Sequence, residues 1–142
     1  SYVDTAWKQG RGQFGFGDGD EATIITAGPD ASRILTAYFR TTFSVTYPAT
    51  VRAVTLDLIR DDGAVAYVNG VEVGRSNMPA GTITAASYAT LGLFGTDETT
   101  PVTLTIPPSL LRAGANSIAV EVHQNSRSSS DFSFDGKVTL LR

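Results

Sequence analysis

Cysteine is absent from the 142-residue chain, and histidine, tryptophan and methionine each occur once. Without cysteine the chain has no disulfides, no thiol nucleophile and no cysteine-ligated zinc. A single histidine also leaves too few nitrogen ligands for a zinc site. A domain of this length can still bury a core large enough to fold without disulfides.

Charge is also sparse. Charged residues make up 18% of the chain, against roughly 25% in an average globular domain. The net charge is -3, and lysine and arginine form no cluster. Both a nucleic-acid interface and a polybasic membrane anchor need such a cluster. No apolar run approaches the ~20 residues that span a bilayer. We therefore expect neither a nucleic-acid partner nor a membrane.

Alternation of apolar and polar residues is the dominant pattern. Val54, Leu56 and Leu58 alternate with Thr55 and Asp57, as a strand with one buried face requires. The same period recurs at residues 39–45, 102–106, 118–122 and 138–140. No window has apolar residues at helical spacing over three turns, and the best candidate, residues 109–113, is one turn at most.

Residues 64–68 and 71–74 flank Asn69-Gly70, a pair that predicts a hairpin with a type I′ turn. Many short strands joined by Gly/Pro turns indicate an all-β fold, and we predict a single jelly-roll β-sandwich of about eight antiparallel strands over residues 1–142. Segments 7–21, 75–100 and 126–130 are expected to be loops. Long loops in compact domains are often functional.

The order "YFRTTFSV", "VTLDLIRDDGAVAYVNGVEVG" and "LTIPPSLLRAGANSIAVEV" resembles the galactose-binding-like jelly roll over residues 34–142. The opening "GQFGFGDGDEAT", residues 12–23, looks like a module attached to large secreted bacterial proteins. The resemblance implies a carbohydrate-binding module of the secreted type. In such modules the loops at one end of the sandwich form the binding site.

A weaker likeness is to the PA14 β-sandwich, carried by "DDGAVAYVNG". In lectins of that family two adjacent aspartates hold a calcium ion that binds sugar hydroxyls. Here these would be Asp61 and Asp62, which we include among the ligand-binding candidates. The alternative is an ordinary turn in which an aspartate caps its own backbone and Gly63 supplies a positive φ.

Acidic residues near both ends of the chain are candidates for a structural calcium site. Asp18, Asp20 and Glu21 lie in a Gly-rich stretch that lets backbone carbonyls approach an ion. Many galactose-binding-like modules hold calcium between an early and a late acidic residue, and Asp135 and Asp131 are the late candidates. The alternative is that these are plain turn aspartates.

Polar side chains gather after two of the predicted strands. His123, Gln124 and Asn125 lead on to Asp131, and the group offers the fixed donors and acceptors that bind sugar hydroxyls. Arg75 and Asn77 follow the hairpin and are expected to meet this group. The alternative is a solvated loop with a histidine whose hydrogen bonds are satisfied within the protein.

Trp7 is a candidate for stacking on a sugar, although a lone tryptophan near the start of a sandwich more often packs in the core or at an edge. Other aromatic platforms in predicted loops are Phe14, Phe16, Tyr88 and Phe94. Phe132 and Phe134 alternate with polar residues and are expected in the core.

Catalytic motifs are missing: the sequence has no G-x-S-x-G elbow, no P-loop and no Rossmann fingerprint. We therefore predict a non-enzymatic, monomeric module that binds a polysaccharide and is tethered to a catalytic domain of a secreted protein. The alternative is a structural domain that packs on its catalytic neighbour. A small hydrolase, the third interpretation, would need a deep pocket with carboxylates whose pKa values are pushed apart.

Overall fold

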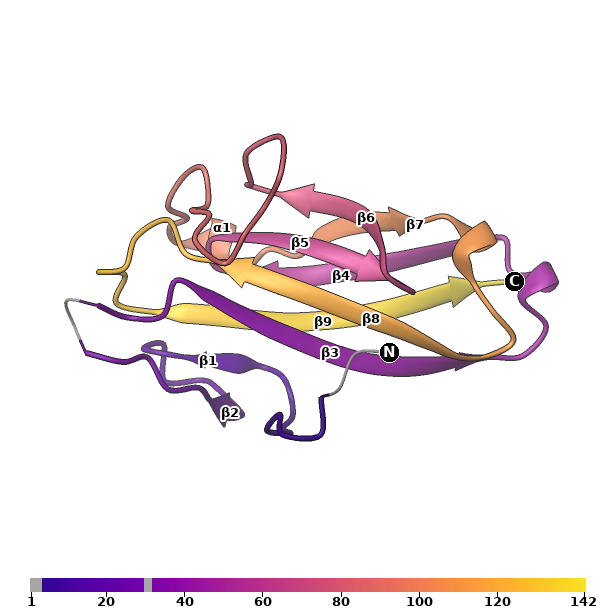
Figure 1. The fold of residues 1–142 in the computed structure, drawn as a ribbon, viewed down its shortest axis with the longest axis horizontal. Helices are drawn as coiled ribbons and strands as arrows, with labels where there is room; N and C mark the ends of the chain where they lie inside the picture. Colours follow the sequence, from indigo (N-terminus) through magenta and orange to yellow (C-terminus); the bar gives the residue numbers. More distant parts are fainter. Residues whose placement is uncertain (1–3, 30–31) are drawn as a thin grey trace.

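Two β-sheets pack face to face in the computed structural model, which describes residues 4–29 and 32–142 (Figure 1). The strands are β1 (Phe14–Phe16), β2 (Thr23–Ile24), β3 (Thr36–Val45), β4 (Ala53–Arg60), β5 (Gly63–Val68), β6 (Val71–Ser76), β7 (Val102–Ile106), β8 (Gly114–His123) and β9 (Phe132–Leu141). Three short helices complete the fold: η1 (Pro48–Thr50), α1 (Thr96–Thr99) and η2 (Pro108–Leu110).

The strand order is β2-β1-β9-β4-β7 in one sheet and β3-β8-β5-β6 in the other. Neighbouring strands are antiparallel except β1 and β2, which form a short parallel pair. The predicted all-β sandwich is confirmed. None of the helices in the described ranges is long and apolar enough to cross a membrane.

The sequence alternation produces the core. In β4 every second residue is buried, including Leu56 and Leu58, and Val120 of β8 lies in the same core cluster. The predicted core positions Phe132 and Phe134 are 0% and 7% exposed. Removing this apolar surface from water stabilises the sandwich by roughly 25 cal/mol per Å².

The hairpin between β5 and β6 forms as predicted. Asn69 and Gly70 have φ of 49° and 83°, the two positive values that a type I′ turn requires. The Asn69 side chain also donates to the carbonyl of Leu110 at 2.8 Å and accepts from the N–H of Ser117 at 3.0 Å. The turn is therefore tied to η2 and to the first half of β8.

Two expectations about irregular segments are wrong. Residues 14–16 form the strand β1 because Phe14 and Phe16 pair with the start of β9. Segment 75–100 contains the end of β6 and the turn of helix α1. The one-turn helix expected at residues 109–113 is instead the 3-10 helix η2.

One end of the sandwich, on the left in Figure 1, collects the connections that matter below. The β4–β5 turn, the long β6–β7 connection with α1, and the β8–β9 connection all meet there. The C-terminus lies away from this group of loops.

Candidate functional site

The structure has a cavity at the loop end of the sandwich, with a volume of about 300 Å³. We call it the loop-end cavity. Its walls come from three connections that are far apart in the chain. The lining residues are Asp61, Asp62, residues 92–94, Glu98, Asn125, Ser126 and residues 128–131.

Asp62 holds two of these connections together. Its carboxylate accepts hydrogen bonds from the backbone N–H groups of Leu93 and Asn125, both at 2.7 Å. Its own N–H donates to the carbonyl of His123 at 3.2 Å. Asp62 is 4% exposed, so both acceptor positions are buried. This carboxylate is a structural anchor for the cavity wall.

Asn77 also holds loop segments together, but it lies outside the cavity lining. Its side-chain amide donates to the carbonyl of Leu91 at 2.7 Å and accepts from the N–H of Leu91 at 3.2 Å. A third bond, at 3.3 Å, goes to the carbonyl of Asp62. Predicted to bind ligand, Asn77 does not line the cavity and instead folds segment 77–91 against the β4–β5 turn.

Asp61 differs from its neighbour. It is 2% exposed, and its backbone N–H donates to the carbonyl of Ser133 at 3.0 Å. Its side chain lines the cavity. As an anion it accepts no hydrogen bond within the described part of the chain. Burial is the main cause that raises the pKa of Asp61 to about 9, and the neighbouring carboxylates, first that of Asp62, add to it.

Two further carboxylates face Asp61. One oxygen each of Asp61, Glu98 and Asp131 lie within 4.8 Å of one another. Burial and the charge of Asp131 raise the pKa of Glu98. The guanidinium of Arg60, next to Asp61 in the chain, donates instead to Ser76 Oγ at 2.9 Å and to the carbonyl of Asp97 at 3.1 Å. The cavity wall is therefore strongly acidic.

The structure thus brings together four predicted ligand-binding residues: Asp61, Asp62, Asn125 and Asp131. The aromatic platform Phe94 lies beside them and is 79% exposed. Glu98 was not predicted, because nothing in the sequence shows where the β6–β7 connection folds. The adjacent acidic pair Asp97-Glu98 marks a charged segment in the sequence, but it does not show that Glu98 lies beside Asp61.

His123 and Gln124 lie inside the protein, and both are 0% exposed. The Nδ1 of His123 donates to the carbonyl of Ser87 at 2.8 Å, and its Nε2 lies 3.2 Å from a carboxylate oxygen of Glu121. The buried side-chain amide of Gln124 has no hydrogen-bond partner among the described residues. Neither residue lines the cavity, and their binding roles stay predictions.

Arg75 is also engaged elsewhere. Its guanidinium donates to Glu72 at 3.0 Å and to the carbonyl of Pro79 at 2.6 Å. The first bond lies within β6, and the second ties the end of β6 to the segment that follows it. Arg75 does not line the cavity, so its contact with a ligand stays a prediction.

The predicted calcium ligands do not form one group. Asp18, Asp20 and Glu21 are clustered, but Glu21 accepts from the N–H groups of Asp18 and Gly19 at 2.9 and 3.1 Å. Those hydrogen bonds lower the pKa of Glu21. Asp135 lies elsewhere and accepts from the N–H of Gly136 at 2.9 Å. A shared ion between this cluster and Asp135 has no geometric support.

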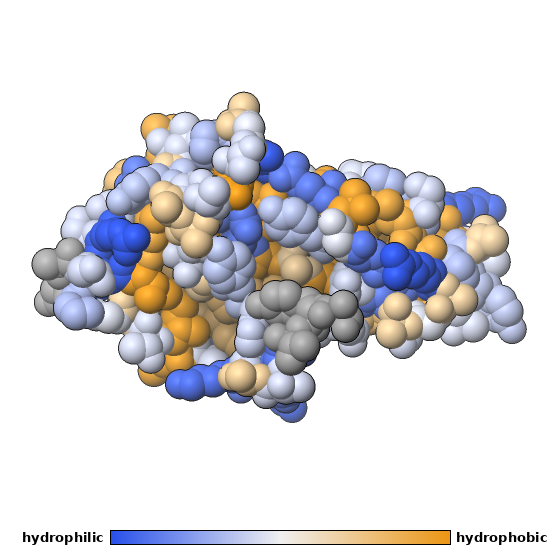
Figure 2. Space-filling view, viewed as in Figure 1, coloured by the Kyte–Doolittle hydropathy of each residue, from blue (hydrophilic) through white to orange (hydrophobic). Residues whose placement is uncertain are grey.

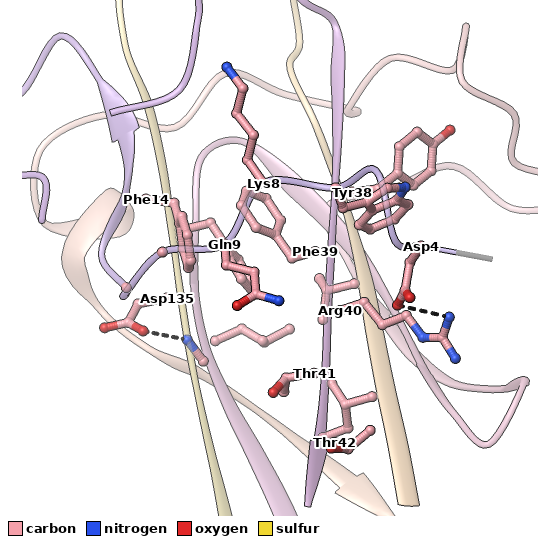
Figure 3. A pocket seen from close by; sticks show the side chains of 18 of the residues that line it. Asp4, Lys8, Gln9, Phe14, Tyr38, Phe39, Arg40, Thr41, Thr42 and Asp135 are labelled. Atoms are coloured by element: carbon pink, nitrogen blue, oxygen red, sulfur yellow. Dashed lines mark hydrogen bonds and ion pairs between the residues drawn. The ribbon is translucent and has the colours of Figure 1, made fainter. Parts of the chain in front are cut away.

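A second, larger cavity of about 1030 Å³ opens at the side of the sandwich, and we call it the lateral cleft (Figure 3). β1 pairs with β9 only at residues 132–134, and the cleft forms beyond that point, between β9 and the edge strand β3 of the other sheet. Leu56, Leu58 and Val120 reach its floor. Figure 2 shows apolar surface between β1 and β3.

Trp7 belongs to the lateral cleft and not to the loop-end cavity. It is 36% exposed. In Figure 3 the Gln9 side chain lies over the cleft beside the Phe14 ring, whereas Lys8 points away from it. The polar rim includes Arg40, which pairs with Asp4 at 3.2 Å. The predicted stacking by Trp7 would take place in this cleft.

No protein-family model and no curated protein matches the chain. Solved structures do resemble it. The α-L-rhamnosidase of Streptomyces avermitilis, complexed with L-rhamnose, is 19% identical, with a TM-score of 0.50 over 75% of this chain and 9% of its own. The native α-L-rhamnosidase of Aspergillus terreus is 17% identical, with a TM-score of 0.53 over 81% of this chain and 13% of its own.

These likenesses show the fold: a β-sandwich of the same kind occurs within much longer chains. The chain spans about a tenth of the length of the structures it resembles. The chemistry of the site rests on the residues described above.

Proposed function

We propose that this domain is a non-catalytic carbohydrate-binding module that holds a glycan in the loop-end cavity. The observation that carries the proposal is the convergence of Asp61, Asn125 and Asp131 beside the exposed ring of Phe94. Polar groups that fix orientation, next to an aromatic surface, match the two faces of a sugar ring.

Size and shape fit this role. A cavity of about 300 Å³ is at the lower end of the range for small-molecule sites, which suits one or two sugar units. Phe94 has its ring in solvent, where a sugar face would shield it from water. Asn125 and the serines at positions 126 and 128–130 supply further polar groups to the lining of the cavity.

The structural neighbours support the proposal that this domain accompanies a catalytic domain. Both are named as α-L-rhamnosidases, and the domain matches a small part of each chain. We propose that this chain is likewise tethered to a catalytic domain that acts on sugars, in a secreted protein. The acidic cavity then supplies binding and leaves the chemistry to the neighbour.

A second candidate is a structural domain that packs on its catalytic neighbour. The lateral cleft favours it, because Trp7 and Tyr38 line the cleft and are 36% and 47% exposed, so a partner that covered the cleft would remove apolar surface from water. The two candidates use different surfaces of the sandwich. Substitutions at the loop-end cavity therefore separate them.

The test is calorimetry of the isolated domain against a panel of neutral and acidic polysaccharides. Phe94→Ala removes the platform and should weaken binding about tenfold, because an aromatic contact is worth roughly 0.5–1.5 kcal/mol beyond its buried area. Tyr88→Ala is the matched control, since Tyr88 is 47% exposed but does not line the cavity. Binding to no glycan, or equal losses in both variants, would refute the proposal.

A further inference from the structure

The second half of β9 has a strand on one side only. β4 pairs with residues 134–141 of β9, whereas β1 pairs only with residues 132–134. Thr23 of β2 donates to the carbonyl of Arg11 at 2.6 Å, so the segment before β1 lies toward β2 and not along β9. Within the described ranges, residues 136–141 of β9 therefore form an open edge, and the lateral cleft lies beside it.

Alternate residues of this edge direct their backbone groups away from β4. The carbonyl of Ser133 accepts from the N–H of Asp61 at 3.0 Å, so the odd-numbered residues of β9 face β4. The backbone groups of an antiparallel strand alternate between its two sides, and those of Val138 and Leu140 therefore face the open side. Neither residue has a backbone hydrogen bond there within the described part of the chain. Such an edge is a template for pairing with another strand.

The side chains that point inward at this side of the sandwich are incompletely covered. Val138 and Leu140 of β9 and Phe39 of β3 pack against the core but are only partly buried. Thr41, two residues further along the same face of β3, is exposed. Figure 3 shows β3 and β9 on the two sides of the cleft. A strand added beside β9 directs every second side chain into this gap.

The charges that line the lateral cleft balance one another. They are two acidic and two basic side chains, Asp4, Asp135, Lys8 and Arg40. Asp4 pairs with Arg40 at 3.2 Å, Asp135 accepts from a backbone N–H at 2.9 Å, and Lys8 points away from the cleft (Figure 3). A charged group brought into the cleft would lose water without gaining a partner. The occupant that matches this lining is therefore uncharged.

We propose that the lateral cleft binds an extended, uncharged segment of a partner protein, which adds to β9 as a further strand. Main-chain hydrogen bonds to Val138 and Leu140 hold the segment, and its alternate apolar side chains fill the cleft. A second copy of this chain does not fit, because the apolar side chains of its β3 and β9 already point into its own core. The inference does not depend on glycan binding in the loop-end cavity.

The experiment is titration of the domain with the acetylated and amidated peptide TVTLTVT, which is uncharged and has apolar residues at alternate positions. Binding is followed by the emission of Trp7, the chain's single tryptophan, which lines the cleft. Hydrogen exchange of the backbone amides is measured in parallel. We expect a Kd below about 1 mM. Exchange at Val138 and Leu140 should slow about tenfold when the free peptide exceeds its Kd tenfold.

A proline substitution tests the edge of β9. Val138→Pro removes an N–H that donates to the peptide and should weaken binding at least about tenfold. Thr105→Pro is the matched control, because β7 is the opposite edge of the same sheet. Thr105 is exposed and lies opposite Thr55, whose backbone groups face β9, so the N–H of Thr105 faces solvent. The Thr105→Pro variant should bind the peptide like the unaltered domain.

A second pair of variants tests the cleft even where Val138→Pro does not fold. Thr41→Lys places a charge in the cleft from an exposed position and should weaken binding at least about tenfold. Ser44→Lys, at an exposed position of β3 outside the cleft lining, should leave the affinity unchanged. Equal affinities of these two variants would overturn the inference.

Two further results would also overturn it. One is the absence of saturable binding up to about 1 mM peptide. The other is a change in Trp7 emission without slower exchange at Val138 and Leu140, because the peptide would then occupy the cleft without adding a strand. Phe94→Ala should bind the peptide like the unaltered domain. A domain that binds the peptide but no glycan would therefore refute the proposed function alone.

Discussion

Asp61 and Asp62 are adjacent in the chain, yet their buried carboxylates have opposite surroundings. Asp62 accepts two backbone N–H groups at 2.7 Å each. Asp61 faces the carboxylates of Glu98 and Asp131. One carboxylate therefore builds the cavity wall, and the other is held at the cavity surface in an environment that disfavours its charge.

Because of this contrast, substitutions at the two positions should change the free energy of unfolding of the metal-free protein in opposite directions. Asp62→Asn keeps one acceptor oxygen and leaves one of two buried N–H groups unpaired, which should lower the free energy of unfolding by about 1–3 kcal/mol. Asp61→Asn removes a buried group that must take up a proton on folding, so it should raise that free energy at pH 7. Urea denaturation in chelator measures both. A loss in both variants would contradict the assignment.

The pH dependence of metal-free stability follows from Asp61. Its pKa is about 9 in the folded protein, against an ordinary value of 3.8. Between these values the folded state holds a proton at Asp61 and the unfolded state does not. The free energy of unfolding should therefore fall as pH rises through this window. Denaturation midpoints in chelator test this, and the slope should be smaller in Asp61→Asn. The same slope in both proteins would exclude Asp61 as its source.

Gly70 lies at φ 83° in the β5–β6 turn, a conformation that a β-branched residue adopts only with strain. Gly70→Val should lower the free energy of unfolding by about 1–3 kcal/mol. Val71→Thr is the control, because Val71 is 48% exposed and has ordinary strand geometry. Thermal melts compare the two. Unchanged stability of Gly70→Val would contradict the type I′ turn.

Trp7 is the chain's single tryptophan and lines the lateral cleft. A glycan in the loop-end cavity should leave its fluorescence unchanged, because no part of that site touches the indole. Trp7→Phe should accordingly bind the glycan as the unaltered domain does. A saturable change in Trp7 emission on adding the glycan would place the ligand in the lateral cleft, where Trp7 stacking was predicted.

The strands and the core were predictable because the local alternation of apolar and polar residues shows which side chains are buried, as at Leu56 and Leu58. The cavity was predictable in part. Asp61, Asn125 and Asp131 follow or precede strands that end on the same side, so topology alone brings them near one another. The role of Glu98 depends on how the β6–β7 connection folds, which no local pattern encodes.

Burial of His123 was also beyond the sequence. The pattern marks residues 123–125 as the start of a loop, but β8 extends through His123, and the carbonyl of Ser87 from the β6–β7 connection bonds to its ring. His123 is therefore an interior residue although it lies at a strand end. The β6–β7 connection folds back over the sheet and supplies a hydrogen bond to a side chain that was expected to contact a ligand.

The most direct test of the account is a ¹⁵N-resolved NMR titration of the domain with a glycan that it binds. We expect the largest shifts at the amides of Leu93 and Asn125, the two N–H groups held by Asp62, and at Phe94. Shifts concentrated instead at Gln9, Thr41 and Gly136, which line the lateral cleft, would contradict the loop-end cavity as the binding site.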